Sequence, residues 1–209
     1  MYIAIEGVIG VGKTSLARLL QTHFDAELIL EAFEENPFLA DFYGDRDRYA
    51  FQTQIFFLLS RYRQQRELIP VIQRSHVISD YTFTKDALFA QITLHGDELA
   101  TYHQVYEALE EGIPRPDLVV YLRATTETAM QRIAKRDRPY ERDMDRNYIE
   151  QVNQSYETFY AHPHRTKTLV IDSNTLDFVA DDAHLTYISN RIRSSLGIAP
   201  YQTELPLEE

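Results

Sequence analysis

Residues 7–14 read GVIGVGKT, and their types and spacing are suited to binding phosphate. Glycines let consecutive backbone N–H groups turn inward around phosphate oxygens, and a following helix N-terminus adds partial positive charge. A lysine at the end of the loop reaches the outer phosphates, and the next hydroxyl suits a magnesium ion that bridges them. The pattern predicts nucleotide handling, without distinguishing hydrolysis from transfer to a substrate. The residues expected to bind the nucleotide here are Gly7, Gly10, Val11, Gly12, Lys13, Thr14 and Ser15, with Thr14 as the magnesium ligand.

The elements around this loop support the interpretation. An apolar run at 2–6 predicts a strand before the loop, and leucines at helical spacing predict a helix over 13–24 after it. Further short runs rich in Val, Ile or Leu at 27–30, 77–79, 118–122 and 168–171 predict four more strands. Parallel strands need helical crossovers, so helices should cover both faces. We expect an α/β fold of the P-loop NTPase type, with a five-stranded parallel sheet.

Two further groups of charged residues are placed for phosphoryl transfer. Glu31 ends the second predicted strand, and the carboxyl ends of such strands line the ligand crevice, so Glu31 is a candidate base. The segment from Arg132 to Arg142 reads RIAKRDRPYER, whose guanidinium groups repel one another unless anions lie nearby. Planar bidentate donors suit phosphate oxygens. We expect an arginine-rich lid over 132–146, the alternative being a solvated basic helix.

Three segments of the chain carry a family resemblance. They read EAFEENPFLADFY, FQTQIFFLLSRYRQ and SDYTFTKDALFA. They resemble the deoxynucleoside kinase family, especially its bacterial deoxyguanosine and deoxyadenosine kinase branch, and the similarity covers nearly the whole chain. The resemblance implies ATP-dependent phosphorylation of the 5′-hydroxyl of a purine deoxynucleoside, with ATP and Mg²⁺ bound, in a homodimer.

The resemblance also implies roles for individual residues. Glu31 takes the proton of the 5′-hydroxyl, Tyr43 binds the sugar, and Gln54, eleven residues later, reads the base. An amide suits a purine edge because it both donates and accepts hydrogen bonds. Asp86 resembles a second base-contacting acid. The lid residues that hold adenine and the transferring phosphoryl group are Arg132, Arg136 and Arg138, and the expected catalytic set is Lys13, Glu31, Arg136 and Arg138.

The chain departs from the family pattern after its third predicted strand. The family usually follows the acid there, Asp80, with Arg, whereas this chain has Tyr81. Asp-Tyr resembles the deoxyguanosine kinase branch, which favours guanine and leaves adenine open, and makes Tyr81 the position expected to reveal the base preference. After the lid, Asp145 is the candidate for binding the sugar 3′-hydroxyl, with Asn147 as its competitor. Asn174 and the Asp177-Phe178 pair resemble the loop that contacts the ATP adenine.

Composition bounds the remaining possibilities. The 209 residues are enough for one domain over 1–209, with a loose tail at about 198–209. The formal net charge of -11 disfavours nucleic acid as a partner, whereas a mononucleotide needs only a few local cations. No cysteine is present, which excludes disulfides, thiolate metal sites and a cysteine nucleophile. We expect no signal peptide, no membrane partner and a cytoplasmic location.

Three other classes of protein share parts of this pattern. A GTPase would carry an NKxD segment, and none follows the third or fourth predicted strand. A nucleoside monophosphate kinase of the thymidylate type needs extra cationic residues near the acceptor phosphate, and the absent Arg at position 81 speaks against it. A kinase-like structural subunit would bind nucleotide without turnover, and the intact GKT and Glu31 argue against that.

Overall fold

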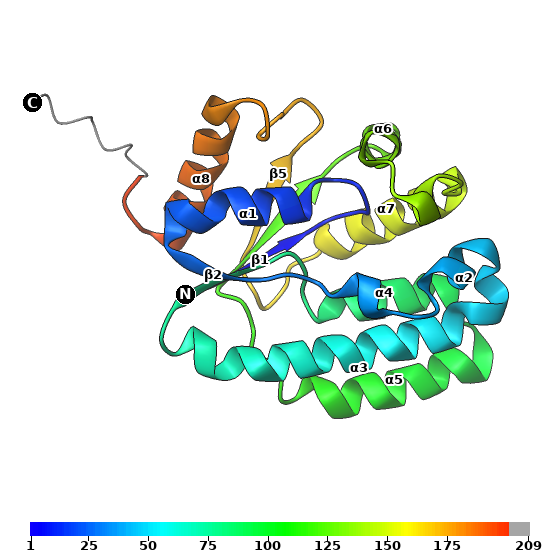
Figure 1. The fold of residues 1–209 in the computed structure, drawn as a ribbon. Coiled ribbons are helices and arrows are strands. Elements are labelled where there is room, and N and C mark those ends of the chain that lie inside the picture. The colour runs from blue at the N-terminus through cyan, green and yellow to red at the C-terminus, as the bar shows by residue number, and fades with distance from the viewer. Residues whose placement is uncertain (201–209) are drawn as a thin grey trace, which may run out of the picture.

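A parallel sheet forms the centre of the computed structural model, which describes residues 1–200. Within these residues the sheet has five strands in the order β2-β3-β1-β4-β5, and every pair is parallel (Figure 1). The predicted fold class is therefore confirmed. The loose tail was predicted from residue 198 onwards, and its part beyond residue 200 lies outside the described residues. The strands are β1 Tyr2–Glu6, β2 Ala26–Ile29, β3 His76–Ser79, β4 Leu118–Arg123 and β5 Thr168–Asp172.

The central strands are apolar because helices cover both of their faces. All five residues of β1 are buried, as are the first five of β4. Such continuous burial is typical of a parallel sheet, where alternate side chains meet a different helical layer. The register pairs Ala4 with both Ser79 and Val119, which aligns the carboxyl ends of β1, β3 and β4 at one edge.

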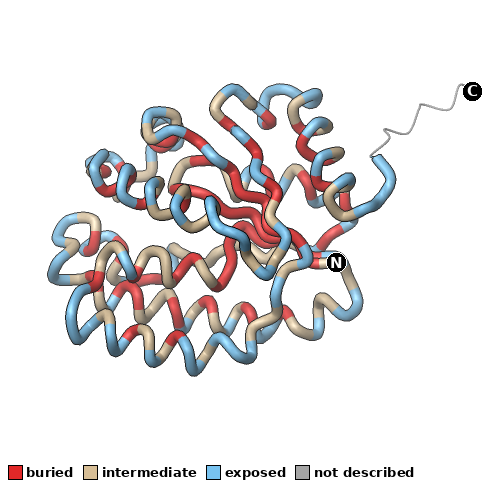
Figure 2. The backbone as a smooth tube through the Cα atoms, turned by 180° about the vertical axis from the view of Figure 1, so that it is seen from behind, coloured by how far each residue is buried: buried red, intermediate tan, exposed pale blue. Residues whose placement is uncertain are grey.

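Helices enclose the sheet in two layers. Helices α1 and α8 lie on one face and α3, α4 and α5 on the other, while α7 packs against α4 and α6 (Figure 1). Figure 2 shows the burial that results, with buried backbone along the strands and exposed backbone on the outward turns of the helices. The helices are α1 Lys13–Phe24, α2 Leu39–Gly44, α3 Arg46–Ile72, α4 Thr84–Thr93, α5 Gly96–Glu110, α6 Thr126–Arg136, α7 Arg146–Tyr160 and α8 Asp182–Leu196, with short 3₁₀ turns η1 Phe33–Glu35 and η2 Pro139–Glu141.

Helix α3 buries polar side chains as well as leucines. Gln54, Leu58, Arg61, Gln65 and Leu68 recur at intervals of three or four and are all buried. A buried polar or charged group costs free energy unless it is paired, so burial of an arginine and two glutamines on one helix face points to a polar site beside it. That site lies at the edge where the strands end. No helix among residues 1–200 is long and apolar enough to cross a membrane.

Candidate active site

The phosphate loop connects β1 to α1 in a conformation that depends on glycine. Gly10 and Gly12 have φ angles of 84° and 107°, in the left-handed region. A Cβ on Gly10 would lie 2.6 Å from the Ile133 side chain, and one on Gly12 would lie 2.9 Å from the Phe178 ring. No side chain caps the N-terminus of α1. The first turn of α1 therefore presents backbone N–H groups that no cap side chain occupies, as an anion-binding site requires.

Lys13 rests on the backbone of its own loop. Its Nζ donates to the carbonyl oxygens of Gly7 at 2.7 Å and Val8 at 3.0 Å. Burial and the positive charge of Lys85 lower the pKa of Lys13 to about 8. A phosphate is a stronger partner for an ammonium group than two carbonyls are, because the hydrogen bond is then charged on both sides. Lys13 is thus placed to exchange the carbonyls for a nucleotide.

Asp80 links the phosphate loop to the candidate base. The Thr14 hydroxyl donates to one oxygen of the Asp80 carboxylate, and the backbone N–H of Glu31 donates to the other at 2.8 Å. Residues 1–200 contain no cluster of three or more His, Cys, Asp or Glu side chains that could hold a metal ion. A hydroxyl and one carboxylate, completed by phosphate oxygens and water, fit Mg²⁺, which keeps several waters.

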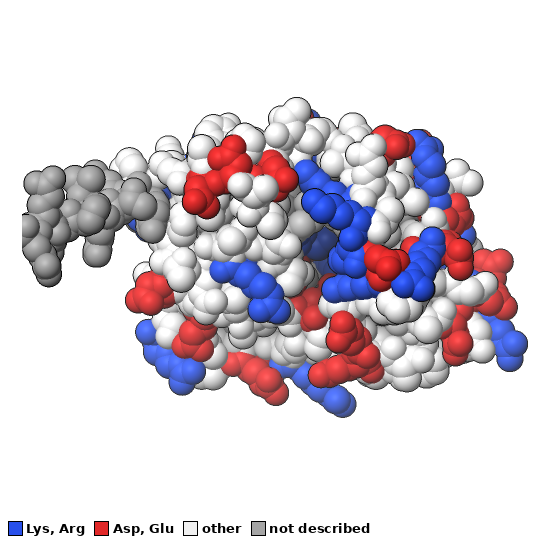
Figure 3. Space-filling view, turned by 45° about the horizontal axis from the view of Figure 1, so that its top comes forward, with Lys and Arg blue, Asp and Glu red and all other residues white. Residues whose placement is uncertain are grey.

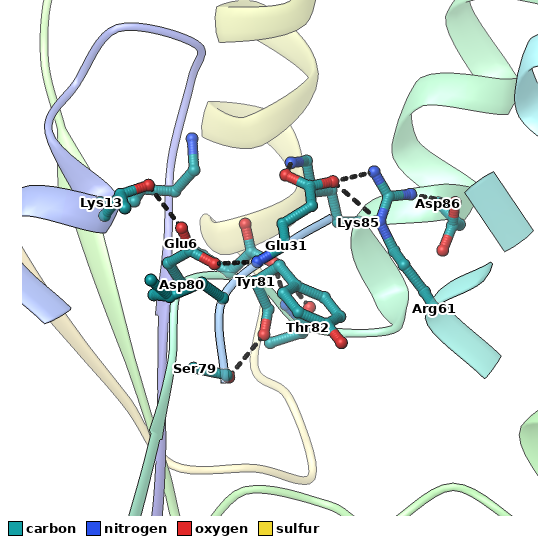
Figure 4. A network of polar contacts seen from close by, with 12 residues as sticks. Glu6, Lys13, Glu31, Arg61, Ser79, Asp80, Tyr81, Thr82, Lys85 and Asp86 are labelled. Atoms are coloured by element: carbon teal, nitrogen blue, oxygen red, sulfur yellow. Dashed lines mark hydrogen bonds and ion pairs between the residues drawn. The ribbon is translucent and has the colours of Figure 1, made fainter. Parts of the chain in front are cut away.

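The Glu31 carboxylate is held by two cations from different helices (Figure 4). Arg61 from α3 donates to Oε1, with its Nε at 2.9 Å, and Lys85 from α4 donates to Oε2 at 2.5 Å. The Glu31 side chain is only 11% exposed. Burial alone would raise its pKa, but Arg61 and Lys85 hold the pKa of Glu31 well below its usual range. The candidate base is therefore ionised at neutral pH.

Asp86 lies on the far side of Arg61 from Glu31 (Figure 4) and forms an ion pair with it. Its side chain is fully buried, and this burial raises the pKa of Asp86 to about 7. Asp86 Oδ2 and Gln54 Oε1 have no hydrogen-bond partner within residues 1–200. Buried polar atoms are nearly always paired, so these two atoms are candidates for contact with a ligand.

An aromatic and acidic wall closes the opposite side of the cleft. The rings of Tyr43 and Tyr140 stack with centroids 6.2 Å apart. Burial raises the pKa of Tyr43, so its hydroxyl keeps a proton to donate. Glu141 is 4% exposed and accepts from Arg136 at 2.6 Å, while Arg138 lies 3.6 Å away. A face of the molecule with a recess beside gathered Lys and Arg side chains appears in Figure 3, despite the overall negative charge.

Nine of the predicted residues meet in this one cleft between the phosphate loop, α3, α4 and the lid segment. Three residues predicted to contact the substrate do not line it, and one of them, Asp86, lies behind Arg61. Tyr81 is fully buried, and its hydroxyl donates to Gln64 Oε1 at 3.0 Å instead. Asp145 caps the N-terminus of α7 through the Asn147 N–H and pairs with Arg46 at 2.6 Å. The predicted residues that line the cleft are Gly10, Lys13, Thr14, Glu31, Tyr43, Gln54, Asp80, Arg136 and Arg138.

The predicted adenine-contacting residues lie behind the phosphate loop, outside the cleft. Arg132 donates to the carbonyl oxygens of Val11 at 3.0 Å and Ser173 at 2.7 Å, and so fastens the loop to the segment after β5. Phe178 is buried against Gly12, and Asp177 accepts from the backbone N–H groups of the turn that follows it. Their proximity to the loop fits a nucleotide-adjacent position.

Sequence reasoning missed four charged residues that build the site. Arg61 lies seven residues after Gln54, two helical turns along the same face, and this spacing could have identified it. Lys85 directly precedes Asp86, and Glu141 follows Arg138 by three residues. Glu6, the last residue of β1, accepts from the Thr82 N–H at 2.6 Å and the Tyr156 hydroxyl at 2.9 Å. For Glu6 the available signal was its place in the sequence, at the end of an apolar strand and directly before the glycine-rich loop.

Fold and site together define a P-loop enzyme of the phosphoryl-transfer class. The sequence model of the family described as deoxynucleoside kinase matches residues 3–196, and the chain belongs to this family. It is 35% identical to a deoxyguanosine kinase of Bacillus subtilis over 92% of this chain and 96% of the relative. It is 34% identical to a deoxyadenosine kinase of Dictyostelium discoideum, over 76% of this chain and 66% of the relative.

A solved structure of the same family has the same arrangement. The deoxyadenosine kinase of M. mycoides, determined with the products dCMP and a flexible dCDP, superimposes with a TM-score of 0.82 at 30% sequence identity. The match covers 93% of this chain and all of that chain. The chain is therefore a deoxynucleoside kinase by family, and the substrate base is the next question.

Proposed function

We propose that this chain transfers the γ-phosphoryl group of ATP to the 5′-hydroxyl of a purine deoxynucleoside, with deoxyguanosine preferred and deoxyadenosine a possible second substrate. The observation that carries the proposal is the ionised Glu31 carboxylate, held by Arg61 and Lys85 in a cleft that Asp80 joins to the phosphate loop. A base in this place meets an acceptor hydroxyl beside the terminal phosphate, which is the geometry that transfer requires.

In the proposed reaction Glu31 takes the proton from the 5′-hydroxyl while the 5′-oxygen forms a bond to the γ-phosphorus. The bond from the γ-phosphorus to the β-phosphate oxygen breaks, and ADP leaves. Lys13 and the lid arginines stabilise the charge on the transferring group, because phosphoryl transfer depends mainly on positioning and charge stabilisation. Thr14 and Asp80 would hold Mg²⁺, which supplies further neutralisation of phosphate charge.

The lid is proposed to close over ATP by exchanging partners. Arg136 and Arg138 now bind the buried Glu141 carboxylate. A phosphoryl group arriving in the cleft offers both guanidinium groups a more highly charged partner. Released from them, Glu141 would face the sugar together with Tyr43, which lies near it across the cleft. Glu141 thus replaces Asp145 as the proposed 3′-hydroxyl ligand.

The proposed base contacts use the unpaired buried atoms. Gln54 Oε1 and Asp86 Oδ2 are both hydrogen-bond acceptors when Asp86 is ionised. Guanine presents an N1–H and an exocyclic amine on one edge, whereas adenine presents its amine beside an unprotonated N1. Two acceptors therefore favour guanine, and the deoxyguanosine kinase of Bacillus subtilis among the relatives supports the same preference. Because Tyr81 faces Gln64, its influence on the base would be indirect.

The test is an acceptor panel with ATP and magnesium, comparing four deoxynucleosides, their monophosphates and no acceptor. We expect fastest transfer to deoxyguanosine. Glu31→Gln should lower kcat by about 10²–10⁴-fold while the nucleoside still binds, because a general base contributes that much. Glu35→Gln, an exposed glutamate in η1, is the control. Transfer to monophosphates alone, or an unchanged rate in Glu31→Gln, would contradict the proposal.

The homodimer and the single domain over 1–209 stay predictions of this proposal, as does the cytoplasmic location. Light scattering on the purified chain tests the dimer directly. A mass of one chain, 24.4 kDa, at assay concentration would contradict it.

A further inference from the structure

Position 81 raises a question about the charge of the candidate base. Where the family usually has Arg, this chain has Tyr81, which is fully buried and donates to Gln64. Tyr81 supplies no positive charge to the cleft, and burial raises its pKa further from neutrality. The cations that contact Glu31 must come from other elements.

We infer that Lys85 is the residue that positions the Glu31 carboxylate and balances its charge in this chain. The inference rests on the proposed role of Glu31 as base. Nothing in the sequence pattern of residues 80–86 distinguishes this lysine from a surface lysine on the first turn of α4. The structure does so through its contacts and its burial.

The Lys85 side chain is 7% exposed and ends against the carboxylate. Its Nζ lies 2.5 Å from Glu31 Oε2 and 5.6 Å from the centre of the Phe89 ring. Arg61 occupies the other oxygen, Oε1. The two oxygens of the carboxylate are therefore bound by one cation from α3 and one from α4. If the carboxylate rotated or turned to solvent, it would lose its contact with at least one of these cations.

Charge balance explains why one cation is insufficient. Arg61 divides its charge between Glu31 and the fully buried Asp86. With both carboxylates ionised, the four side chains carry two positive and two negative charges. Without Lys85, two buried carboxylates would share one guanidinium. Glu31 Oε2 would then be buried without a charged partner, and no cation from α4 would fix the orientation of the carboxylate.

No other group within residues 1–200 is placed to substitute for Lys85. Lys13 binds the loop carbonyls, and the lid arginines bind Glu141. Asp80 contacts the backbone of Glu31 and adds negative charge nearby. The titratable or charged groups that face Glu31 are Lys13 from α1, Tyr43 from α2, Arg61 from α3, Asp80 after β3, Lys85 and Asp86 from α4, and Arg136, Arg138 and Glu141 from the lid segment.

The experiment measures kcat and KM for the deoxynucleoside at saturating ATP and one neutral pH in Lys85→Met and Lys85→Arg. Misplacing a catalytic group costs up to about 10²-fold in rate, so Lys85→Met should lower kcat by about 10–10²-fold while the KM stays within about twofold. Lys85→Arg keeps the positive charge beside Oε2 and should recover most of the lost kcat. Lys135→Met, an exposed lysine on α6, is the matched control.

The outcomes separate the roles of the two residues. An unchanged kcat in Lys85→Met, or a raised KM alone, would show a packing role and overturn the inference. An equal loss of kcat in Lys85→Arg would overturn it too. Wild-type turnover in Glu31→Gln would instead contradict the role of Glu31 as base. If Lys85→Met does not fold, judged by its thermal melt, Lys85→Gln keeps a hydrogen-bond donor without the charge and is expected to lower kcat in the same way.

Discussion

The cleft has two charged regions. We call the part around Glu31 the acceptor cleft, and the part formed by Lys13 and the lid arginines the phosphate side. The charged groups of these two regions have different partners. In the acceptor cleft, Arg61, Lys85, Glu31 and Asp86 are paired with one another, and none of their side chains is more than 11% exposed. On the phosphate side, Lys13 contacts neutral carbonyls. The lid arginines are about one-third exposed and share a single glutamate. One region is already neutralised, while the other holds cations without matching anions.

This difference indicates which region adapts when substrates bind. Separating a buried ion pair leaves an uncompensated charge in a medium of low polarity, which is strongly unfavourable. Moving an ammonium group from carbonyl oxygens to phosphate is favourable, since a charged acceptor replaces a neutral one. The acceptor cleft is therefore preorganised around the base, and the phosphate side rearranges around the nucleotide.

Lys13→Ala sharpens this contrast and has the largest expected effect. Removing one preorganised charge that stabilises a transition state lowers kcat by about 10²–10³-fold, and the KM for ATP should rise as well. The dissociation constant for the deoxynucleoside, measured by calorimetry without ATP, should stay within about twofold of the wild type, because the four paired residues of the acceptor cleft are unchanged. Arg18→Ala, an exposed residue of the same helix, is the control. An equal loss of deoxynucleoside affinity would contradict the division into two regions.

Local patterns were sufficient to predict the framework of both regions. The bounds of β1 and α1 agree with the structure at both ends, and the other strands agree within one residue, because an apolar run between breakers defines a buried parallel strand. The same logic predicted that Glu31 lies at the ligand edge, since the carboxyl ends of parallel strands share one edge, whereas Asp80 was named from the resemblance. Gln54 followed from the resemblance.

Tertiary pairing could not be predicted from these patterns. Burial of Arg61 and Lys85 depends on helices α3 and α4 meeting at Glu31, and such a meeting leaves no local signal. Tyr81 was expected in the cleft, yet a side chain just past a strand end can turn to either side. The lid segment has no helical period between α6 and α7, so spacing gave no signal for Glu141, which the structure places in the lining of the cleft.

Asp86→Asn tests the acceptor cleft through the pH dependence of stability. Burial raises the folded-state pKa of Asp86 to about 7, whereas an unfolded chain releases this proton near about 3.9. The folded protein thus binds more protons between these values, and the Asp86 contribution makes the free energy of unfolding fall as pH rises through this window. Asparagine does not titrate, so the stability of the variant relative to wild type should improve from pH 5 to pH 8.

Thermal melts across this range measure the difference. One displaced pKa unit corresponds to about 1.4 kcal/mol, and 1 kcal/mol shifts Tm by about 2–4 °C in a chain of this size. We expect the Tm of Asp86→Asn to gain several degrees on wild type between the two pH values. The Tm of Asp97→Asn, a change at an exposed position in α5, should vary with pH in the same way as that of the wild type. A Tm difference between Asp86→Asn and wild type that does not change with pH would indicate that Asp86 stays ionised throughout.

Asp145→Ala has the smallest expected effect and defines where the acceptor cleft ends. In the structure Asp145 caps α7 and pairs with Arg46, and both side chains are at least one-third exposed. Loss of an N-cap costs about 1 kcal/mol, and a surface ion pair adds at most about 1 kcal/mol more. The KM for the deoxynucleoside should therefore stay unchanged while Tm falls by a few degrees, and Asp145→Asn, which keeps the cap, should recover most of the stability.

Glu141→Gln supplies the contrast for this variant. Because Glu141 lines the cleft beside Tyr43 and the lid arginines, its change should raise the KM for the deoxynucleoside by about tenfold, the loss of one charge-assisted hydrogen bond of about 1.5 kcal/mol. A raised KM in Asp145→Ala with a normal KM in Glu141→Gln would return the 3′-hydroxyl to Asp145. That result would extend the acceptor cleft to the N-terminus of α7, and the lid would then have to move far enough to bring an exposed helix cap against the sugar.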